Sequence, residues 1–363
     1  MRQRRIAGAN WYFEESELQD RAFDPDRIEE RLVLLRKFRR WLEERGIELH
    51  TWDMVDPSDP DVEYVLLFDW CRYHDKKFGK ALRKIPFNKR VLVMIEPATM
   101  NMELHYLPFY RRLFSKIFTY HQRLLDRHPE YIPINNPMFG ADSDAPAYLS
   151  RPDFQLPYSE RKLLVTVASH RWSFNPLANF RSREKVFAYF DRHFPNDFDL
   201  WGRYWGQPLN IFERIFHPRQ FQTCRGELPL NVEAKLALYS RYRFCLCFEN
   251  ETNDPGFITD RITDPFCSRC VPVYWGPLSI TDHVPPECFI NYRDFKGPQE
   301  LALFLKNMPR ERYEAYVEAM EKFVKSERMH FFTTNYMFET IYNYLFKQDV
   351  PGDASRSSLR AFA

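Results

Sequence analysis

Acidic and amide side chains gather between two apolar runs late in the chain. Residues 242–248 (YRFCLCF) and 271–275 (VPVYW) are rich in β-branched and aromatic residues, which predicts two buried strands. The polar residues that follow the first run are Glu249, Asn250, Glu251, Asn253 and Asp254. A helical segment comes next, with Thr259 as its expected N-cap. Strand, polar loop, helix and strand form a β-α-β unit, whose loops bind ligands at the carboxyl ends of parallel strands.

Two arginines stand where an anion would be held. Arg261 lies in the first turn of the expected helix, and Arg183 opens a second expected helix at 183–194. Guanidinium groups and helix N-terminal amides suit phosphate oxygens. The alternative is structural, with Arg261 paired to Asp264 three residues on and Arg183 paired to a neighbour on its own helix. Residue spacing leaves both interpretations open.

Glycine-rich phosphate loops are missing from the sequence. No GxGxxG follows a strand, no GxxxxGK[ST] occurs, and the chain has only 11 glycines, which argues against the Rossmann dinucleotide and P-loop classes. A structural zinc ion would need Cys267 and Cys270 to converge with Cys245 and Cys247, and no histidine stands nearby in a ligand pattern. We therefore expect no bound metal and no cofactor.

The composition is that of a globular protein with room for two domains. The 363 residues are 44% hydrophobic and 17% aromatic, enough for two cores. The net charge of +2 does not point to nucleic acid. The basic clusters at 2–5 (RQRR) and 36–40 (RKFRR) suit either an anionic membrane surface or a solvated basic face.

Cysteine usage and hydropathy predict a cytoplasmic protein. The seven cysteines are an odd number and lie mostly in apolar strands, as expected of reduced thiols. No apolar run reaches the roughly 18 to 20 residues of a membrane span, and no apolar signal core follows the first arginines. Peripheral contact with the inner membrane stays an alternative.

Strands and helices alternate through both halves of the chain, which predicts doubly wound α/β domains. The expected strands outside the central stretch are at 63–70, 89–97, 115–121, 162–169 and 198–202. A Pro- and Asn-rich stretch from 129 to 157 is the natural linker. We expect domains at 1–157 and 158–330, with a last helix in 331–363 that packs back toward the first domain and ends in a loose tail.

The residues from 248 to 295 resemble glycosyltransferase family 10, the α-1,3/4-fucosyltransferases. The family signature has a strand ending in FEN, then [YF][VI]TEK[IL], VPVxxG and P-x-x-[SC]-F-[IV]-x-x-x-D-F. The matching segments are FEN (248–250), FITDR (257–261), VPVYWG (271–276) and PPECFINYRDF (285–295). Weaker similarity reaches 167–190, 94–101 and 118–133.

The resemblance implies a GT-B fold, in which two Rossmann-like doubly wound domains face a cleft. It also implies that the first domain binds the acceptor glycan, that the second binds GDP-fucose, and that the transfer inverts the sugar without an obligatory metal. By motif position, Arg183 and Arg261 match the pyrophosphate-binding cations and Asp260 matches an acidic donor contact. The remaining expected donor-binding residues are Glu249, Asn250, Phe257 and Thr259. This chain has TDR where the family has TEK, so Asp260 is one methylene shorter and Arg261 replaces lysine.

An inverting transfer needs a general base for the acceptor hydroxyl, and the first domain must supply it. Glu96 is the first candidate, because it ends an expected strand at 90–96 in a segment similar to the family's E-S-P-T-H-T stretch. His121, at the end of the strand at 115–121, is the second candidate. A structural role is the alternative for each of them.

These features together predict a fucosyltransferase of bacterial surface-polysaccharide synthesis, with a nucleotide sugar and a glycan acceptor as its partners. Two alternatives stay open. One is a GT-B enzyme that uses another nucleotide sugar, and the other is a non-catalytic sugar-binding protein that retains the fold.

Overall fold

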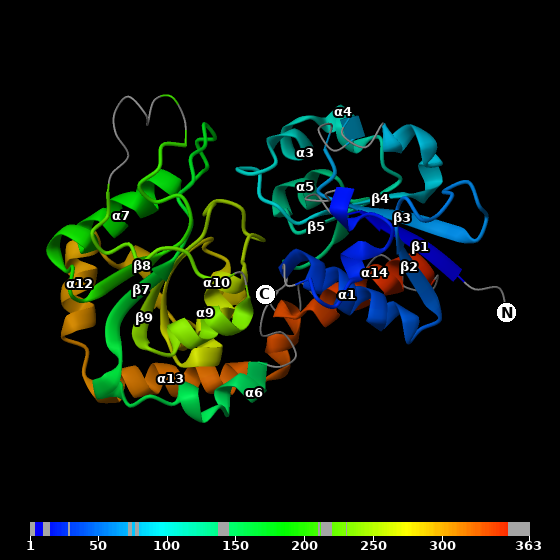
Figure 1. Cartoon of the computed structure of the whole chain (residues 1–363). Helices are drawn as coiled ribbons and strands as arrows, with labels where there is room; N and C mark the ends of the chain where they lie inside the picture. Colours follow the sequence, from blue (N-terminus) through cyan, green and yellow to red (C-terminus); the bar gives the residue numbers. More distant parts are fainter. Residues whose placement is uncertain are drawn as a thin grey trace. The chain divides into compact units, whose positions relative to one another are not determined.

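The computed structural model of the chain describes residues 4–9, 15–27, 30–71, 75–76, 80–136, 145–209, 211, 220–229 and 231–347 (Figure 1). These residues form two compact units, unit 1 from 4–136 with 334–347 and unit 2 from 145–333. The functional domain limits at 157 and 330 stay a prediction. The side chains of the basic cluster at 2–5 and the expected tail at 348–363 lie outside the described part of the chain.

Unit 1 is built on a six-stranded parallel sheet with the order β2-β1-β3-β4-β5-β6. Its strands are β1 (Arg4–Ala9), β2 (Ile47–Thr51), β3 (Val62–Phe68), β4 (Arg90–Met94), β5 (Lys116–Thr119) and β6 (Ile132–Pro133). The inner strands β3 and β4 are mostly apolar and buried, as expected of strands covered on both faces. Strand β1 is absent from the sequence-based prediction, although it lies between β2 and β3.

The last helix of the described residues completes the core of unit 1. The helices of this unit are α1 (Glu30–Glu43), α3 (Met102–Tyr106), α4 (Pro108–Arg111), α5 (Gln122–Arg127) and α14 (Thr334–Phe346). Figure 1 shows α14 beside α1, and the Phe38 and Phe338 rings stack with their centroids 4.7 Å apart. Met337 and Ile341 are fully buried in the same core, so α14 is fixed to unit 1 by apolar packing.

Unit 2 has a five-stranded parallel sheet with the order β11-β10-β9-β7-β8. Its strands are β7 (Lys162–Val167), β8 (Phe198–Trp201), β9 (Tyr242–Phe248), β10 (Val271–Trp275) and β11 (Ile290–Asn291). Its helices are α6 (Ala145–Leu149), α7 (Phe180–His193), α9 (Val232–Tyr239), α10 (Asp260–Thr263), α11 (Ile280–His283), α12 (Pro298–Lys306) and α13 (Arg310–Val324). The middle strand β9 is buried at all but one residue, so its carboxyl end is a rigid base for the loop that follows.

Two parallel sheets, each connected through helices, confirm the expected α/β class. Among the helices of the described residues, none has the length and apolar character needed to cross a bilayer.

Candidate functional site

Glu249 and Asn250 follow the last residue of β9, at the edge of the sheet where parallel strands end. The backbone N–H of Glu249 donates to the carbonyl of Trp275 at 2.9 Å, so the chain is still paired with β10 at this point. Strand β7 is the other neighbour of β9, and its carboxyl end lies at the same edge. Residues that follow β7 and β9 are therefore brought together.

The Glu249 carboxylate is fully buried and surrounded by donors. The backbone N–H and the hydroxyl of Thr259 each lie 3.0 Å from it, and the Tyr274 hydroxyl donates to it at 3.2 Å. The Arg261 Nη1 atom donates to its other oxygen at 3.1 Å. Burial raises the pKa of Glu249, although Arg261 and Thr259 favour the charged carboxylate.

Thr259 also begins the short helix α10, which confirms its expected role as N-cap. Its side-chain oxygen accepts from the backbone N–H of Arg261 at 3.3 Å. The Arg261 guanidinium turns back toward Glu249 and donates through Nη2 to Asn250 Oδ1 at 3.4 Å. The partner of Arg261 is thus Glu249, and the salt bridge with Asp264 that spacing allowed is not formed.

Arg183 reaches the same place from α7. Its Nη1 atom donates to Asn250 Oδ1 at 2.9 Å, and its Nη2 atom donates to the carbonyl of Ser169 at 2.7 Å. Burial, reinforced by the positive charge of Arg261, lowers the pKa of Arg183 to about 9. The guanidinium remains charged at neutral pH, so two cations are held close together, and Glu249 is the carboxylate that hydrogen-bonds to Arg261.

Asn179, the residue before α7, fixes the start of this helix to the end of β9. Its backbone N–H donates to the carbonyl of Asn250 at 2.8 Å, and its side-chain amide donates to the carbonyl of Glu249 at 3.3 Å. An antiparallel β-bridge joins the adjacent residues Ala178 and Glu251. These bonds explain why Arg183, one turn further along α7, lies beside Asn250.

Asp260 points to a different partner, the ammonium of Lys235 on α9. The two groups are 2.5 Å apart, and the same ammonium lies 2.6 Å from the carboxylate of Asp264. Although burial opposes the charge, Lys235 and Arg261 hold the pKa of Asp260 down to about 2. Asp260 is therefore a charged carboxylate with a fixed orientation.

The expected donor-binding residues thus fall into three positions. Arg183, Glu249, Asn250, Thr259 and Arg261 form one hydrogen-bonded cluster, which we call the arginine cluster. Asp260 adjoins it through the backbone but pairs with Lys235. The Phe257 ring is buried in the segment that leads into α10.

In unit 1, Glu96 and His121 are linked through a third residue, His105. The Glu96 carbonyl lies 3.1 Å from His105 Nε2, and the His105 and His121 rings meet edge to face with centroids 4.0 Å apart. Burial and the neighbouring His121 lower the pKa of His105 well below its ordinary value. His121 itself is buried.

Asp69, at the end of β3, positions the backbone of Glu96. Its carboxylate accepts from the N–H of Ile95 at 3.1 Å and from the N–H of Glu96 at 3.1 Å. Complete burial and the nearby charge of Glu96 raise the pKa of Asp69 well above its ordinary value. Asp69 also has a positive φ of 47°, a left-handed conformation that aspartate adopts more readily than most residues.

Four residues that contact the expected site residues are absent from the sequence-based prediction. Asp69 and His105 contact Glu96, Asn179 contacts Glu249 and Asn250, and Lys235 contacts Asp260. For two of them a local signal existed. Asp69 follows a strongly apolar strand, and Lys235 is a lone cation in the helical run NVEAKLALY. Neither signal indicates the partner, because each partner is distant in sequence.

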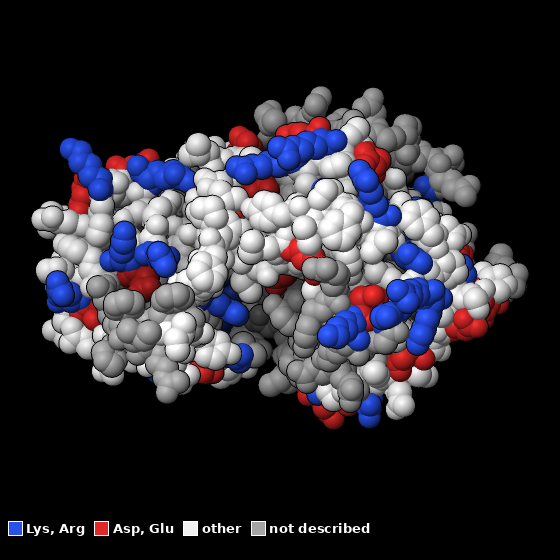
Figure 2. Space-filling view, turned by 90° about the horizontal axis from the view of Figure 1, so that it is seen from above, with Lys and Arg blue, Asp and Glu red and all other residues white. Residues whose placement is uncertain are grey.

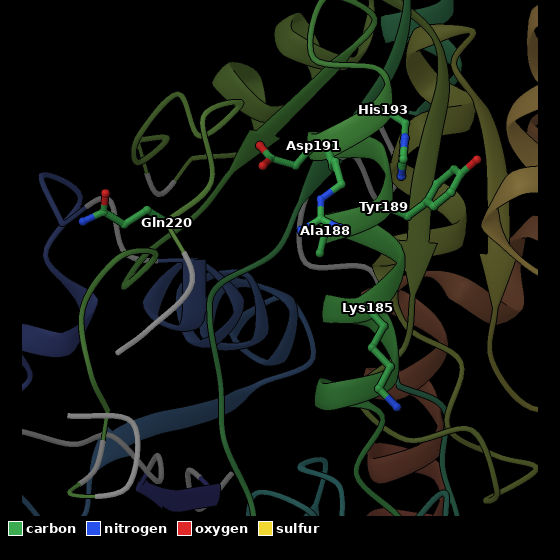
Figure 3. Close-up of a pocket in the computed structure, with 7 residues that line it drawn as sticks. Lys185, Ala188, Tyr189, Asp191, His193 and Gln220 are labelled. Carbon is green, nitrogen blue, oxygen red and sulfur yellow. The ribbon is translucent and has the colours of Figure 1, made fainter. Parts of the chain in front are cut away.

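A cavity of about 400 Å³ lies along α7, away from the arginine cluster. Figure 3 shows it between this helix and Gln220, with Lys185 and Asp191 extending from the helix. Asp191 accepts from the backbone and hydroxyl of Thr223 at 2.9 and 2.8 Å, which ties the 220–223 segment to α7. The cavity shares no lining residue with the arginine cluster and is a separate feature.

The cysteines that raised the question of zinc are all buried free thiols: Cys245, Cys247, Cys267 and Cys270. Burial raises the pKa of Cys267 and of Cys270 well above the ordinary value. In the part of the chain that the structure describes, no three His, Cys, Asp or Glu residues are grouped so as to hold a metal ion.

Known proteins are similar to this chain in sequence and in fold. The α-(1,3)-fucosyltransferase FucT of Helicobacter pylori is 38% identical over 84 residues, which cover 23% of this chain and only 17% of that protein. A crystal structure of an α1,3-fucosyltransferase with GDP-fucose has a TM-score of 0.50 at 19% identity, covering 95% of this chain and 91% of that one. An α-glucosyltransferase in complex with UDP and DNA has a TM-score of 0.55 at 11% identity, covering 94% and 99%.

The likeness to solved structures confirms the expected GT-B fold class. Residues 171–349 match the profile of the family described as "Glycosyltransferase family 10 (fucosyltransferase) C-term". This range contains the whole arginine cluster together with Lys235 and Asp260. By this match residues 171–349 of the chain belong to glycosyltransferase family 10, the fucosyltransferase family.

Proposed function

We propose that the protein transfers L-fucose from GDP-fucose to a hydroxyl of an acceptor glycan, with inversion at the sugar carbon. The observation that carries the proposal is the convergence of Arg183 and Arg261 on Asn250 Oδ1, beside one buried carboxylate. Two guanidinium groups at the edge of a parallel sheet suit a diphosphate, because its negative charge relieves their mutual repulsion. The family match and the GDP-fucose complex of a similar fold support fucose as the donor sugar.

In the proposed reaction a general base removes the proton of the acceptor hydroxyl as its oxygen attacks the sugar carbon. GDP leaves from the opposite side, and the arginines stabilise the charge that develops on its diphosphate. Glu96 is our first candidate for the base and His121 the second. Asp69 supports Glu96, since it holds the backbone N–H groups of Ile95 and Glu96. We propose that no bound metal or cofactor takes part, with the arginines supplying the positive charge.

The direct test is GDP release from GDP-fucose by the purified protein, with a panel of glycan acceptors and with or without a chelator. We expect acceptor-dependent release that the chelator leaves unchanged. Calorimetry with GDP-fucose measures donor binding separately. Absence of both release and binding would contradict the proposal.

A second candidate function is transfer from another nucleotide sugar. It is favoured by the TDR sequence. The Asp260 carboxylate is bound by Lys235, and the Arg261 guanidinium is bound by Glu249 and Asn250. These contacts set the reach of both side chains, and an arginine for lysine exchange at a phosphate changes the geometry of binding. A thermal-shift panel of GDP-linked and UDP-linked sugars separates the two candidates, since the true donor should raise the melting temperature most.

We also propose a cytoplasmic setting in bacterial surface-polysaccharide synthesis, with peripheral contact to the inner membrane. The free thiol state of the cysteines supports a reducing compartment. Fractionation of the producing cell measures the distribution directly, and we expect the protein in the cytoplasm and on the inner membrane.

A further inference from the structure

Large apolar side chains are exposed along α3, α4 and the turn after them, in unit 1. The exposed fractions are 49% for Met102, 50% for Tyr106, 54% for Phe109 and 38% for Leu113. Phe87, from the segment before β4, is exposed at 54%. We call these five side chains the apolar face. Scattered single exposed apolar residues are ordinary, but a contiguous group marks an interaction surface.

The two helices that carry most of the apolar face follow each other in sequence and are in contact. Met102 and Tyr106 are four residues apart on α3, and Phe109 and Leu113 are four apart on the helical turns from Pro108 onward, so each pair shares one side. The Arg90 guanidinium joins the ends, because it donates to the carbonyl of Leu113 at 3.2 Å and lies 6.0 Å from the centre of the Phe87 ring.

The opposite side of the same helices is anchored in the core of unit 1. Leu104, Tyr110 and Phe114 are buried there. The helices are therefore held in place by one apolar side and present a second one outward.

The stretch of sequence that carries the apolar face is rich in lysine and arginine, although Arg111 is buried. Residues 83–116 contain seven lysines and arginines against two glutamates, a net charge of +5, whereas the whole chain has +2. Arg83, Lys84 and Arg112 are exposed among them. Figure 2 shows blue Lys and Arg side chains, with red Asp and Glu side chains among them, around white areas on the face of unit 1 that is seen from above. Apolar and aromatic side chains within a basic rim are typical of proteins that lie on an anionic bilayer.

We propose that the apolar face docks unit 1 on an anionic lipid surface. Exposed aromatic and aliphatic side chains enter the headgroup region, and the basic rim attracts acidic phospholipids. The same rim disfavours a second copy of this chain as the occupant, because two faces of equal positive charge repel each other. The inference gives the peripheral membrane contact proposed above a defined surface.

The test is co-sedimentation of the full chain with vesicles of phosphatidylcholine alone and of phosphatidylcholine mixed with phosphatidylglycerol. We expect binding to the mixed vesicles, weakened by high salt because the lipid charge is screened. The double variant Phe109→Ser/Leu113→Ser should lower the partition coefficient about tenfold or more, since two apolar side chains no longer leave water. Its matched control is Leu278→Ser/Leu303→Ser, which removes two exposed leucines of unit 2 and should bind as the parent does.

Three results would overturn the proposal: no binding to the mixed vesicles, binding that the Phe109/Leu113 variant retains, or equal loss in the control. If light scattering finds a dimer that only the Phe109/Leu113 variant abolishes, the occupant is a second copy and not a lipid surface. Circular dichroism checks that this variant folds. If the Phe109/Leu113 variant does not fold, vesicle binding is measured on the triple variant Arg83→Gln/Lys84→Gln/Arg112→Gln, which removes the basic rim and should bind less. Vesicle binding is measured without donor or acceptor, so its failure is distinct from failure of the transferase proposal.

Discussion

Arg183 and Arg261 share one acceptor, the side-chain oxygen of Asn250, at 2.9 and 3.4 Å. The two cations come from different helices, α7 and α10, and the only carboxylate bonded to either side chain among the described contacts is Glu249. We propose that the diphosphate of the donor binds beside these two guanidinium groups, which suit its oxygens.

Removing either guanidinium should therefore cost most of the activity. We expect Arg183→Ala and Arg261→Ala each to lower kcat/KM for GDP-fucose. The loss should correspond to about 2 to 4 kcal/mol of transition-state stabilisation, the range for a charge-stabilising donor. Initial rates of GDP release measure the effect. Arg261→Lys is the matched control, because it keeps the charge but loses the two-pronged contact with Glu249 and Asn250, and it should retain more activity than alanine. A rate near that of the parent in either alanine variant would remove that residue from the site.

Glu249→Gln should destabilise unit 2. Four donors meet the carboxylate, from Thr259 twice, Tyr274 and Arg261, and a glutamine amide presents its own N–H groups to some of them. We expect a loss of about 1 to 3 kcal/mol in the free energy of unfolding, the cost of a buried unmatched polar group. Urea denaturation measures it. Glu44→Gln, at a side chain 61% exposed, is the control and should change stability little. An equal effect at both positions would argue against the network.

Asp260 should make the free energy of unfolding depend on pH at the acid end. Its pKa in the folded chain is about 2, below the ordinary value of 3.8. A carboxyl with a lowered folded pKa contributes stability above its unfolded pKa and loses it as the pH falls through the folded pKa. The contribution is about 2 kcal/mol above pH 4 and vanishes toward pH 2.

Denaturation of the parent and of Asp260→Asn between pH 6 and pH 2 tests this dependence. The difference in unfolding free energy between the two proteins should shrink steadily below pH 4, because the parent loses the charge that the variant lacks. A difference that stays constant over the whole range would show that Lys235 does not stabilise the Asp260 carboxylate.

Glu96→Gln should abolish transfer and leave donor binding intact. A general base contributes about 10² to 10⁴ in rate, and glutamine cannot accept the proton. GDP release with acceptor measures turnover, while calorimetry with GDP-fucose measures binding. Under this assignment His121→Gln lowers the rate less, because His121 does not take the proton and reaches Glu96 through His105. If the order of the two effects is reversed, His121 is the base. A protein that binds the donor but shows no turnover before or after the Glu96 change is a sugar-binding protein.

Much of the local structure followed from the sequence. Alternation of apolar runs with helical segments predicted strands β3, β4, β5, β7, β8, β9 and β10 near their observed places. Strand β1 was missed, because RRIAGA has a single large apolar residue, Ile6, and becomes a strand through pairing with β2 and β3. The arginine cluster was predictable in part, since Glu249, Asn250, Thr259 and Arg261 lie within one short stretch after a buried strand.

The sequence by itself determined which side chains carry charge, where the strands end, and which motif links the chain to its family. Only the tertiary structure decided that Arg183 meets Asn250, that Lys235 holds Asp260, and that Asp69 and His105 flank Glu96. Strand propensity and capping depend on neighbouring residues, so a local pattern reveals them. Contacts between strand ends depend on sheet order, which is set by the packing of the whole core and leaves no local trace.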